Sequence, residues 1–454
     1  MKTKHTRPAA RILTASILLS TALTGLTASR AIAAEDEAVG MIVELITGSD
    51  KDMQTMAIGQ VRKQSPGKDA TLRFAALLEK LPADAQAKLI DALGARGDAA
   101  ARSAILKMRD SKNETVRIAA ADALSALASP DDIPALVKLA ATGSDAEKLA
   151  ARNTLRKLKG DKMDAAMIAA MKDADAKAKV ELIDALTDRN VTTAAPVIIK
   201  DAEDADSGVR LAVLNAMRSL GDESHAPVLV KRMKSAEDKK ERVKAALAML
   251  SVCRREKAKC ATAVIAGFDG ADTATRVLLI RVLTEAGGTK SLDQIVASLK
   301  ADDKNVSTAA LRALAGWPDR AASPHLKVLA RDVKNLRTHI MAMRGIVRLA
   351  GPTGSLPADL AALGEAMKLA TRKEEKVLVL GMLGTIPTAE SLTMVTASLD
   401  QAELAEDACF AAVLIGEKIS KDHKDQAKTA MQKVSKTAKN EKTRARAAKV
   451  LQGL

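Results

Sequence analysis

Apolar residues recur along this chain with the period of an α-helix, often in segments that are apolar on nearly every side. The stretch "VRIAAADALSAL" (residues 116–127) is an example, since its only polar members are Arg117, Asp122 and Ser125. A helix of this kind is buried between neighbouring helices, so the pattern predicts a helix over 115–128. A second, amphipathic helix is predicted over 133–141, after the turn "SPDD".

The same pair of helices is predicted many times over, because the sequence repeats itself. "LIDALGAR" (89–96) and "LIDALTDR" (182–189) are separated by about three steps of 31 residues. The leucine of "DAL" serves as an anchor, and an equivalent residue recurs at steps of 31 to 37 residues. A period of this size is typical of one two-helix unit stacked on itself. The anchors are Leu93, Leu124, Leu155, Leu186, Met217, Leu250, Leu283, Leu314, Ile346, Leu383, Leu414 and Leu451.

One position in each anchor helix is expected to face solvent. The residue two before the anchor lies about 200° around the helix from it and can reach water. We predict that this row lines the open groove of the array, on its concave face, which explains the carboxylate of Asp122 in an otherwise apolar helix. The row reads Asp91, Asp122, Asn153, Asp184, Asn215, Ala248, Arg281, Arg312, Arg344, Gly381, Ala412 and Lys449.

Along this row, carboxylates and amides give way to arginines. Such a change of sign is suited to orienting a partner of opposite polarity. The other interpretation is that an exposed position simply needs a polar residue, since exposed charges alone are weak evidence for binding. Arginine makes bidentate contacts with carboxylate, phosphate or sulfate. The candidate binding residues are Asp91, Asp122, Asn153, Asp184, Asn215, Arg281, Arg312, Arg344 and Lys449.

Many anchor helices begin with Asp or Asn four residues before a basic residue. An Asp or Asn at this point is expected to cap the helix by accepting hydrogen bonds from its free N–H groups. The pairs are Asn113 with Arg117, Asp175 with Lys179, Asp206 with Arg210, Asp238 with Arg242, Asp272 with Arg276, and Asn440 with Arg444.

The turn followed by a "VRxAAxxAL" helix resembles HEAT repeats of the phycobilisome-lyase-like type over residues 41–454. Residues 311–416 further resemble a HEAT module of exported bacterial proteins. The resemblance implies an all-α fold, an α-solenoid of about twelve helix pairs, in which the Asp and Arg residues form a ladder between stacked units. Ser307, His339 and Asp407 occupy the ladder's basic position, so we expect the ladder to be interrupted in the C-terminal half.

The first 33 residues have the layout of a secretory signal peptide. Basic residues precede an apolar run, and the small residues "AIAA" (31–34) stand at the cleavage position. The run is short for a membrane span, and an uncleaved N-terminal anchor is the alternative. We expect an exported protein, periplasmic or secreted, with no membrane span in the mature chain. After residues 1–33 we predict a linker over 34–40 and then the repeat array over 41–454. The last part of the array, 417–454, is predicted to be a basic capping repeat.

The composition supports a helical core, since 47% of the residues are hydrophobic but only 1% are aromatic. Without residues 1–33, which hold five basic residues and no acid, the net charge falls from +15 to +10. The excess is local, with eleven Lys or Arg against four acids in each of 231–259 and 417–449. Basic clusters attract polyanions, but the rings that stack on single-stranded nucleic acid are missing. Solvated helix faces are the favoured interpretation.

Cys253 and Cys260 lie seven residues apart across a predicted turn. In an oxidising compartment this pair is able to form a disulfide, and spacing alone leaves a disulfide and two free thiols equally open. Cys409 lies in an apolar run and is expected to be a buried thiol.

The motifs contain no reactive cluster. The five histidines are scattered, and no HExxH, CxxC, GxSxG, GxGxxG or P-loop pattern occurs, so we predict no catalytic site, metal or cofactor. We predict a monomeric, non-catalytic scaffold that binds a protein or peptide of the cell envelope on the concave face of the array. Two alternatives stay open: a binder of polyanions such as acidic glycan or nucleic acid, and, by resemblance, a bilin-lyase-like enzyme acting on a client protein.

Overall fold

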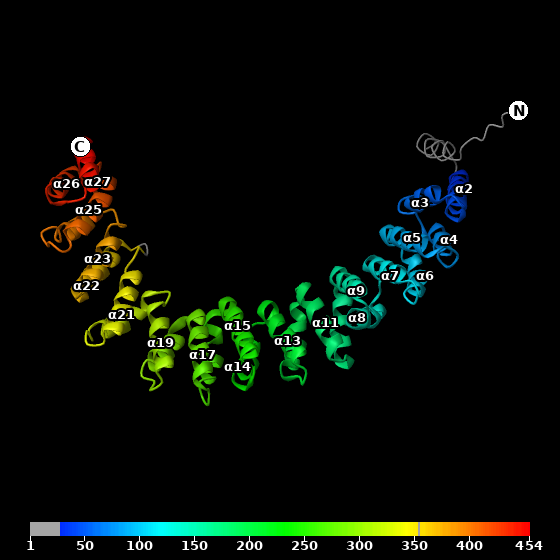
Figure 1. Ribbon diagram of the computed structural model, residues 1–454, viewed down its shortest axis with the longest axis horizontal. Coiled ribbons are helices and arrows are strands. Elements are labelled where there is room, and N and C mark those ends of the chain that lie inside the picture. The colour runs from blue at the N-terminus through cyan, green and yellow to red at the C-terminus, as the bar shows by residue number, and fades with distance from the viewer. Residues whose placement is uncertain (1–27, 353–354) are drawn as a thin grey trace. The chain divides into compact units, whose positions relative to one another are not determined.

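The structure is a computed structural model that describes residues 28–352 and 355–454, with side chains from residue 35 onward. Over these residues the chain forms α-helices and short 3-10 helices and no β-strand (Figure 1), which confirms the predicted all-α solenoid. The helices divide into two compact units, unit 1 ending at Leu220 and unit 2 beginning at Gly221. The predicted signal peptide lies, up to residue 27, outside the described residues.

Unit 1 repeats the predicted pair of an anchor helix and a partner helix. Consecutive anchor helices pack on one another, and the partner helices lie between them in a second layer. Residues 34–40, predicted as a linker, lie inside α2 (Ala28–Thr47), so this stretch is helical instead. The anchor helices are α5 (Ala83–Arg96), α7 (Glu114–Leu127), α9 (Asp145–Lys157), α11 (Ala176–Asp188) and α13 (Ser207–Leu220). The others are α3 (Lys51–Gln60), α4 (Lys68–Ala75), α6 (Arg102–Met108), α8 (Ile133–Thr142), α10 (Asp161–Ala170) and α12 (Ala195–Ile198).

Unit 2 continues the same alternation of anchor and partner helices. Its anchor helices are α15 (Lys239–Glu256), α17 (Thr273–Ala286), α19 (Lys304–Ala315), α21 (Leu336–Leu349), α23 (Lys373–Leu383), α25 (Ala405–Ile419) and α27 (Glu441–Gln452). Its partner helices are α14 (Ala226–Ser235), α16 (Ala261–Ala266), α18 (Gly288–Ser298), α20 (Ser323–Ala330), α22 (Leu356–Leu369), α24 (Ala389–Thr396) and α26 (Lys424–Thr437).

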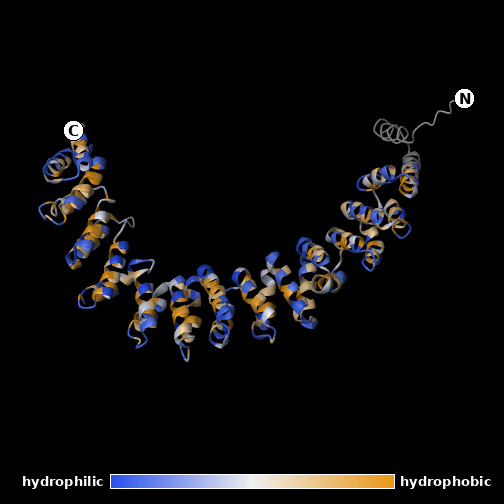
Figure 2. Cartoon of the chain, in the orientation of Figure 1, coloured by the Kyte–Doolittle hydropathy of each residue, from blue (hydrophilic) through white to orange (hydrophobic). Residues whose placement is uncertain are grey.

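The core of both units is built from the anchors and their apolar neighbours. The anchors from Leu93 to Leu383 are buried, and hydrophobic and hydrophilic residues alternate around each helix (Figure 2). Burying one such side chain stabilises a fold by about 1.5–3 kcal/mol. Leu414 is only half-buried, so the predicted register is wrong in α25; Leu451, in the last helix, is also half-buried.

Small residues allow neighbouring anchor helices to approach closely. At Gly94, an added Cβ would lie 2.8 Å from Cβ of Ala123 on the next anchor helix. At Gly345, an added Cβ would lie 3.0 Å from Cα of Ala315. The shortage of aromatic side chains therefore matches a core in which backbones nearly touch.

The predicted helix caps are confirmed. Asn113 accepts hydrogen bonds from the N–H groups of Thr115 and Val116, because its side chain stands where those donors lack a partner within the helix. The side chains of Asp175, Asp206, Asp238, Asp272 and Asn440 accept from the first turns of their helices in the same way.

Charged pairs join successive anchor helices, but their acid partners vary. Arg242 donates to the capping Asp272 of the next anchor helix at 2.9 Å, as the ladder predicts. Arg117 instead donates to Glu147, inside the first turn of the next anchor helix, at 2.5 Å. This hydrogen bond is the main reason that the pKa of Glu147 is lowered.

Among the remaining predicted ladder residues, Lys179 and Arg210 use other partners, and Arg276 lies near the capping aspartate of the next anchor helix. The ammonium group of Lys179 lies 2.8 Å from Asp201 and 3.0 Å from Asp204, and the hydrogen bond to Asp201 is the main reason that its pKa is raised. Arg210 donates to the carbonyl oxygens of Asp204 and Ala205. Arg276 lies near Asp303, whose pKa it helps to lower, although hydrogen bonds from Thr273 and the backbone come first.

The expectation that the ladder is interrupted at His339 is wrong. His339 is 1% exposed and its Nε2 lies 3.0 Å from Oε2 of Glu375 on the next anchor helix. These two residues hold the positions that Arg117 and Glu147 hold in unit 1, counted from the anchors. A histidine therefore replaces the arginine and keeps the contact between repeats. At Ser307 the hydroxyl bonds only the carbonyl oxygen of Asp303 within its own helix, so that interruption stands.

Candidate functional site

The predicted row reaches solvent in both units. Asn153 and Asp184 are half-buried, and the other predicted binding residues are exposed: Asp91, Asp122, Asn215, Arg281, Arg312, Arg344 and Lys449. Their exposure is consistent with a binding surface, and their role in binding stays a prediction.

The row differs from the sequence prediction at two helices of unit 2. Ala248 is fully buried, whereas Leu247 beside it is 38% exposed. Ala412 is also buried, and Phe410 is 50% exposed. Gly384 approaches Ala411 much as Gly94 approaches Ala123, which places Phe410 at the position of Asp122. The exposed row of unit 2 therefore holds Leu247, Arg281, Arg312, Arg344, Gly381 and Phe410.

Three arginines form the centre of this row, and we call them the arginine row: Arg281 on α17, Arg312 on α19 and Arg344 on α21. These helices pack on one another in that order. Within residues 28–352 and 355–454, none of the three side chains makes a hydrogen bond or ion pair. Each guanidinium offers up to five donors, so this surface presents unused positive charge.

Acidic groups are scarce around the arginine row. Helices α19 and α21 contain no Asp or Glu, and α17 contains only Glu285. Glu285 lies 3.4 Å from Arg254 of the preceding anchor helix. The positive charge of the arginine row is therefore not neutralised by its own helices.

The row of unit 1 carries the opposite sign. Burial raises the pKa of Asp91, Asp122 and Asp184, and the neighbouring carboxylates add to the effect at Asp91 and Asp184. Basic residues lower these pKa values in turn, Lys157 at Asp122 for example. The row of unit 1 therefore holds three partly desolvated carboxylates, and Asn153 and Asn215 place neutral amides at the equivalent position of two other repeats.

Replacing Asp122 with asparagine should raise the melting temperature at pH 7, by no more than about 2 °C. Burial raises the pKa of Asp122, so the folded state disfavours its carboxylate. The wild type regains this stability as the pH falls through the raised folded pKa, and the gain is complete below the unfolded value of about 3.9. Thermal unfolding from pH 7 to pH 3 should show the two proteins converging. A difference that widens toward low pH would contradict this explanation.

The cysteine pair is close together and reduced in this structure. Cys253 and Cys260 are free and buried at the end of α15 and in the 3-10 helix that follows. A hydrogen bond between the two thiols, together with burial, raises the pKa of Cys253, and the same bond lowers that of Cys260. The disulfide stays a prediction for an oxidising compartment. Cys409 is a buried free thiol, as predicted, and burial raises its pKa to about 11.

Ion pairs engage part of the two basic clusters. In 231–259, Arg232 lies 2.8 Å from Glu241 and Lys259 lies 2.9 Å from Glu256. In 417–449, Arg446 lies 2.6 Å from Glu417. These pairs fit solvated helix faces better than an open polyanion site.

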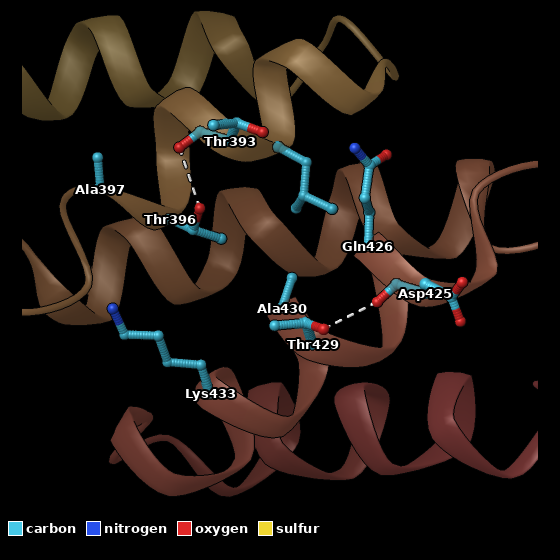
Figure 3. Close-up of a pocket in the computed structure, with 9 residues that line it drawn as sticks. Thr393, Thr396, Ala397, Asp425, Gln426, Thr429, Ala430 and Lys433 are labelled. Atoms are coloured by element: carbon cyan, nitrogen blue, oxygen red, sulfur yellow. Dashed lines mark hydrogen bonds between the residues drawn. The ribbon is translucent and has the colours of Figure 1, made fainter.

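A hollow of about 520 Å³ lies between α24 and α26 in unit 2 (Figure 3). The hydroxyls of Thr393, Thr396 and Thr429 bond backbone oxygens of their own helices, and Lys433 lies 2.7 Å from Asp400. The three hydroxyls and the ammonium group of this hollow are therefore engaged within the protein. In the part of the chain that the structure describes, no group of three or more His, Cys, Asp or Glu is placed to hold a metal ion. No helix there is long and apolar enough to cross a membrane.

A family model of HEAT repeats matches residues 70–156 and 164–250. These segments contain the anchor helices α5, α7, α11 and α13 and most of α9 and α15, so the resemblance in the sequence is confirmed there. A comparison with curated proteins finds no match.

Solved structures similar to this chain include karyopherins. They are Kap121p bound to the SUMO protease Ulp1p (12% identity, TM-score 0.45), Kap121p bound to Ste12p (12%, 0.48) and importin beta in an ammonium sulfate condition (12%, 0.33). They cover 98%, 98% and 91% of this chain, which in turn covers 55%, 57% and 72% of theirs. The chain thus spans little more than half the length of Kap121p.

Proposed function

We propose that this HEAT-repeat α-solenoid is a non-catalytic scaffold that binds a protein or peptide through the solvent-facing rows of its anchor helices. Stacked repeats present long surfaces in which each unit contributes the same position. The arginine row carries the proposal, because three exposed arginines stand at one position of successive helices without an internal partner.

Two other arginines of unit 2 show how an arginine can join neighbouring repeats in this fold. Arg320 pairs with the buried Asp359, and Arg348 donates to the carbonyl oxygens of Ala315 and Trp317. Their donors hold neighbouring repeats together. Within the described residues the arginine row makes no such contacts, so the recurrence of positive charge at one position of three repeats is better explained by a partner outside the chain.

The two rows favour a partner with both signs of charge. Unit 1 offers Asp91, Asp122 and Asp184, and unit 2 offers the arginine row. We propose that basic groups of the partner meet unit 1 and acidic groups meet unit 2, since complementary charge sets the orientation of binding.

We also propose that the protein acts outside the cytoplasm. The support is the layout of residues 1–33, with basic residues, an apolar run and small residues at 31–34. Export weighs against bilin-lyase activity, since by the family resemblance such lyases act inside the cell. Polyanion binding is the second candidate, because 231–259 and 417–449 each hold an excess of basic residues. Ion pairs neutralise part of that charge.

The test is capture of the partner by crosslinking in the native cell. A variant with Arg281, Arg312 and Arg344 changed to glutamate should recover the partner about tenfold less than the wild type, or worse. Its melting temperature should stay within about 2 °C, because all three side chains are exposed. Mass spectrometry of the captured chain should also find a mature N-terminus just after residues 31–34.

A matched control carries the same change of charge away from the row. Lys290, Lys300 and Lys304 are exposed and make no ion pair in the described part of the chain, so their change to glutamate should leave recovery unaltered. Equal recovery by the wild type and the arginine variant would remove the proposed function.

A further inference from the structure

The spacing of the arginine row limits the kind of segment that can contact all three residues at once. Successive packed helices lie about 8–10 Å apart, and α17, α19 and α21 pack directly on one another. A ligand that meets the row must therefore present a negative group about every 8–10 Å. A segment in polyproline II conformation rises about 3.1 Å per residue with three residues per turn, which returns every third side chain to the same side after about 9.3 Å.

The surface beyond Arg344 is apolar and open. Gly381 on α23 is exposed, and a Cβ added to it would meet no atom within 4 Å. Leu378 on the same helix is 42% exposed and Phe410 on α25 is 50% exposed. Arg446 lies over the ring of Phe410, with its guanidinium carbon 5.7 Å from the ring centroid, and is also paired with Glu417. Arg446 thus covers part of the ring, while the rest of the ring stays open to solvent.

We infer that the arginine row and Phe410 together bind an extended acidic segment of a partner protein, with a carboxylate at every third residue and one apolar side chain near Phe410. This inference rests on the proposed function and specifies the partner for unit 2. Each guanidinium is able to hold one carboxylate through two parallel hydrogen bonds. The apolar side chain belongs about six residues beyond the outermost carboxylate, since two helix spacings separate Arg344 from Phe410.

Charge complementarity favours this occupant over a polyanionic polymer. The acid-free helices α19 and α21 attract any anion, but the apolar patch at Leu378, Gly381 and Phe410 gives a uniform polyanion little more to bind, because Arg446 beside it is already paired with Glu417. An acidic segment that ends in an apolar residue uses both parts of the surface. A phosphate or sulfate polymer uses only the first.

The experiment measures binding of labelled synthetic peptides to the full chain by fluorescence anisotropy. One peptide carries three glutamates, one at every third position, with proline and serine at the positions between them. Its leucine stands six residues beyond the last glutamate. A second has the same composition with its glutamates contiguous. We expect the spaced peptide to bind about tenfold more tightly, because only it places one carboxylate at each arginine.

Variants assign the effect to the row. Changing Arg281, Arg312 and Arg344 to glutamine should remove the preference for the spaced peptide, whereas the same change at Lys290, Lys300 and Lys304 should keep it. Phe410→Ala should weaken the spaced peptide about threefold to tenfold and make the leucine of the peptide irrelevant. Circular dichroism of each variant shows that it is folded.

Equal binding of the two peptides would overturn the inference. So would heparin that binds more tightly than the spaced peptide and whose affinity is the same in Phe410→Ala as in the wild type. If capture of the cellular partner still depends on the arginine row in that case, the proposed function stands and only the extended acidic segment is wrong. If capture is also unaffected, both are wrong.

Discussion

Replacing His339 with alanine should lower the free energy of unfolding of unit 2 by about 1–3 kcal/mol, because it removes the side chain that contacts the buried carboxylate of Glu375 from the preceding anchor helix. Nδ1 of His339 lies 2.6 Å from the carbonyl oxygen of Ala330, and Nε2 lies 3.0 Å from Oε2 of Glu375. That carboxylate oxygen also accepts hydrogen bonds from the backbone N–H groups of Thr371 and Arg372, so it acts as an acceptor throughout. Each ring nitrogen of the histidine therefore lies within hydrogen-bond distance of an oxygen atom.

Urea unfolding measures this loss, and two further variants locate its cause. His339→Arg restores the pair that Arg117 and Glu147 form in unit 1, so it should be much more stable than His339→Ala. The double variant His339→Ala with Glu375→Ala should lose less than the two single changes together, because neither side chain is then left without the other. A loss below about 1 kcal/mol for His339→Ala would contradict the assigned role.

The same substitution at two glycines of unit 1 should have opposite effects. Gly94→Ala should destabilise the unit by about 1–3 kcal/mol, because its new methyl group would overlap Ala123 across the α5–α7 contact. Gly59→Ala should stabilise it by about 0.4–1 kcal/mol, because an added Cβ meets nothing within 4 Å and alanine reduces the freedom of the unfolded chain.

The two glycine variants control for one another, since both replace a helical glycine by alanine. Denaturant midpoints should fall for Gly94→Ala and rise for Gly59→Ala, with unchanged slopes. Shifts in the same direction would show that close approach of α5 and α7 does not limit the stability of unit 1.

Much of the fold is predictable from the sequence. The anchors from Leu93 to Leu383 are buried, the predicted second helix over 133–141 is α8, and the capping residues accept hydrogen bonds as expected. These features depend on residues within about one helical turn of each other. A local pattern therefore contains the information that decides them.

The rotation of α15 and α25 about their own axes is not predictable from a local pattern. In α15 and α25 nearly every candidate anchor is apolar, so the sequence does not show which residue faces the neighbouring helix. The structure turns Leu247 and Phe410 outward, and in α25 the close approach of Gly384 to Ala411 accompanies that rotation.

The partners across the ladder are also decided by packing. The sequence predicts that capping aspartates receive the basic side chains, which holds for Arg242 and Asp272. At Arg117 and His339 the acid that lies within reach is instead a glutamate of the next anchor helix. Which acid is chosen depends on the offset between stacked helices, and that offset involves residues about thirty positions apart.

The sequence by itself determined the helices, their caps, their repetition and the row of polar positions, because each depends on hydrogen bonds and hydrophobic period within a short stretch of chain. The tertiary structure decided which side chains of the row reach solvent, which charges are paired and which stay free. Those outcomes depend on how far each helix is rotated and shifted against its neighbours, and only the packing of distant residues sets that rotation and shift.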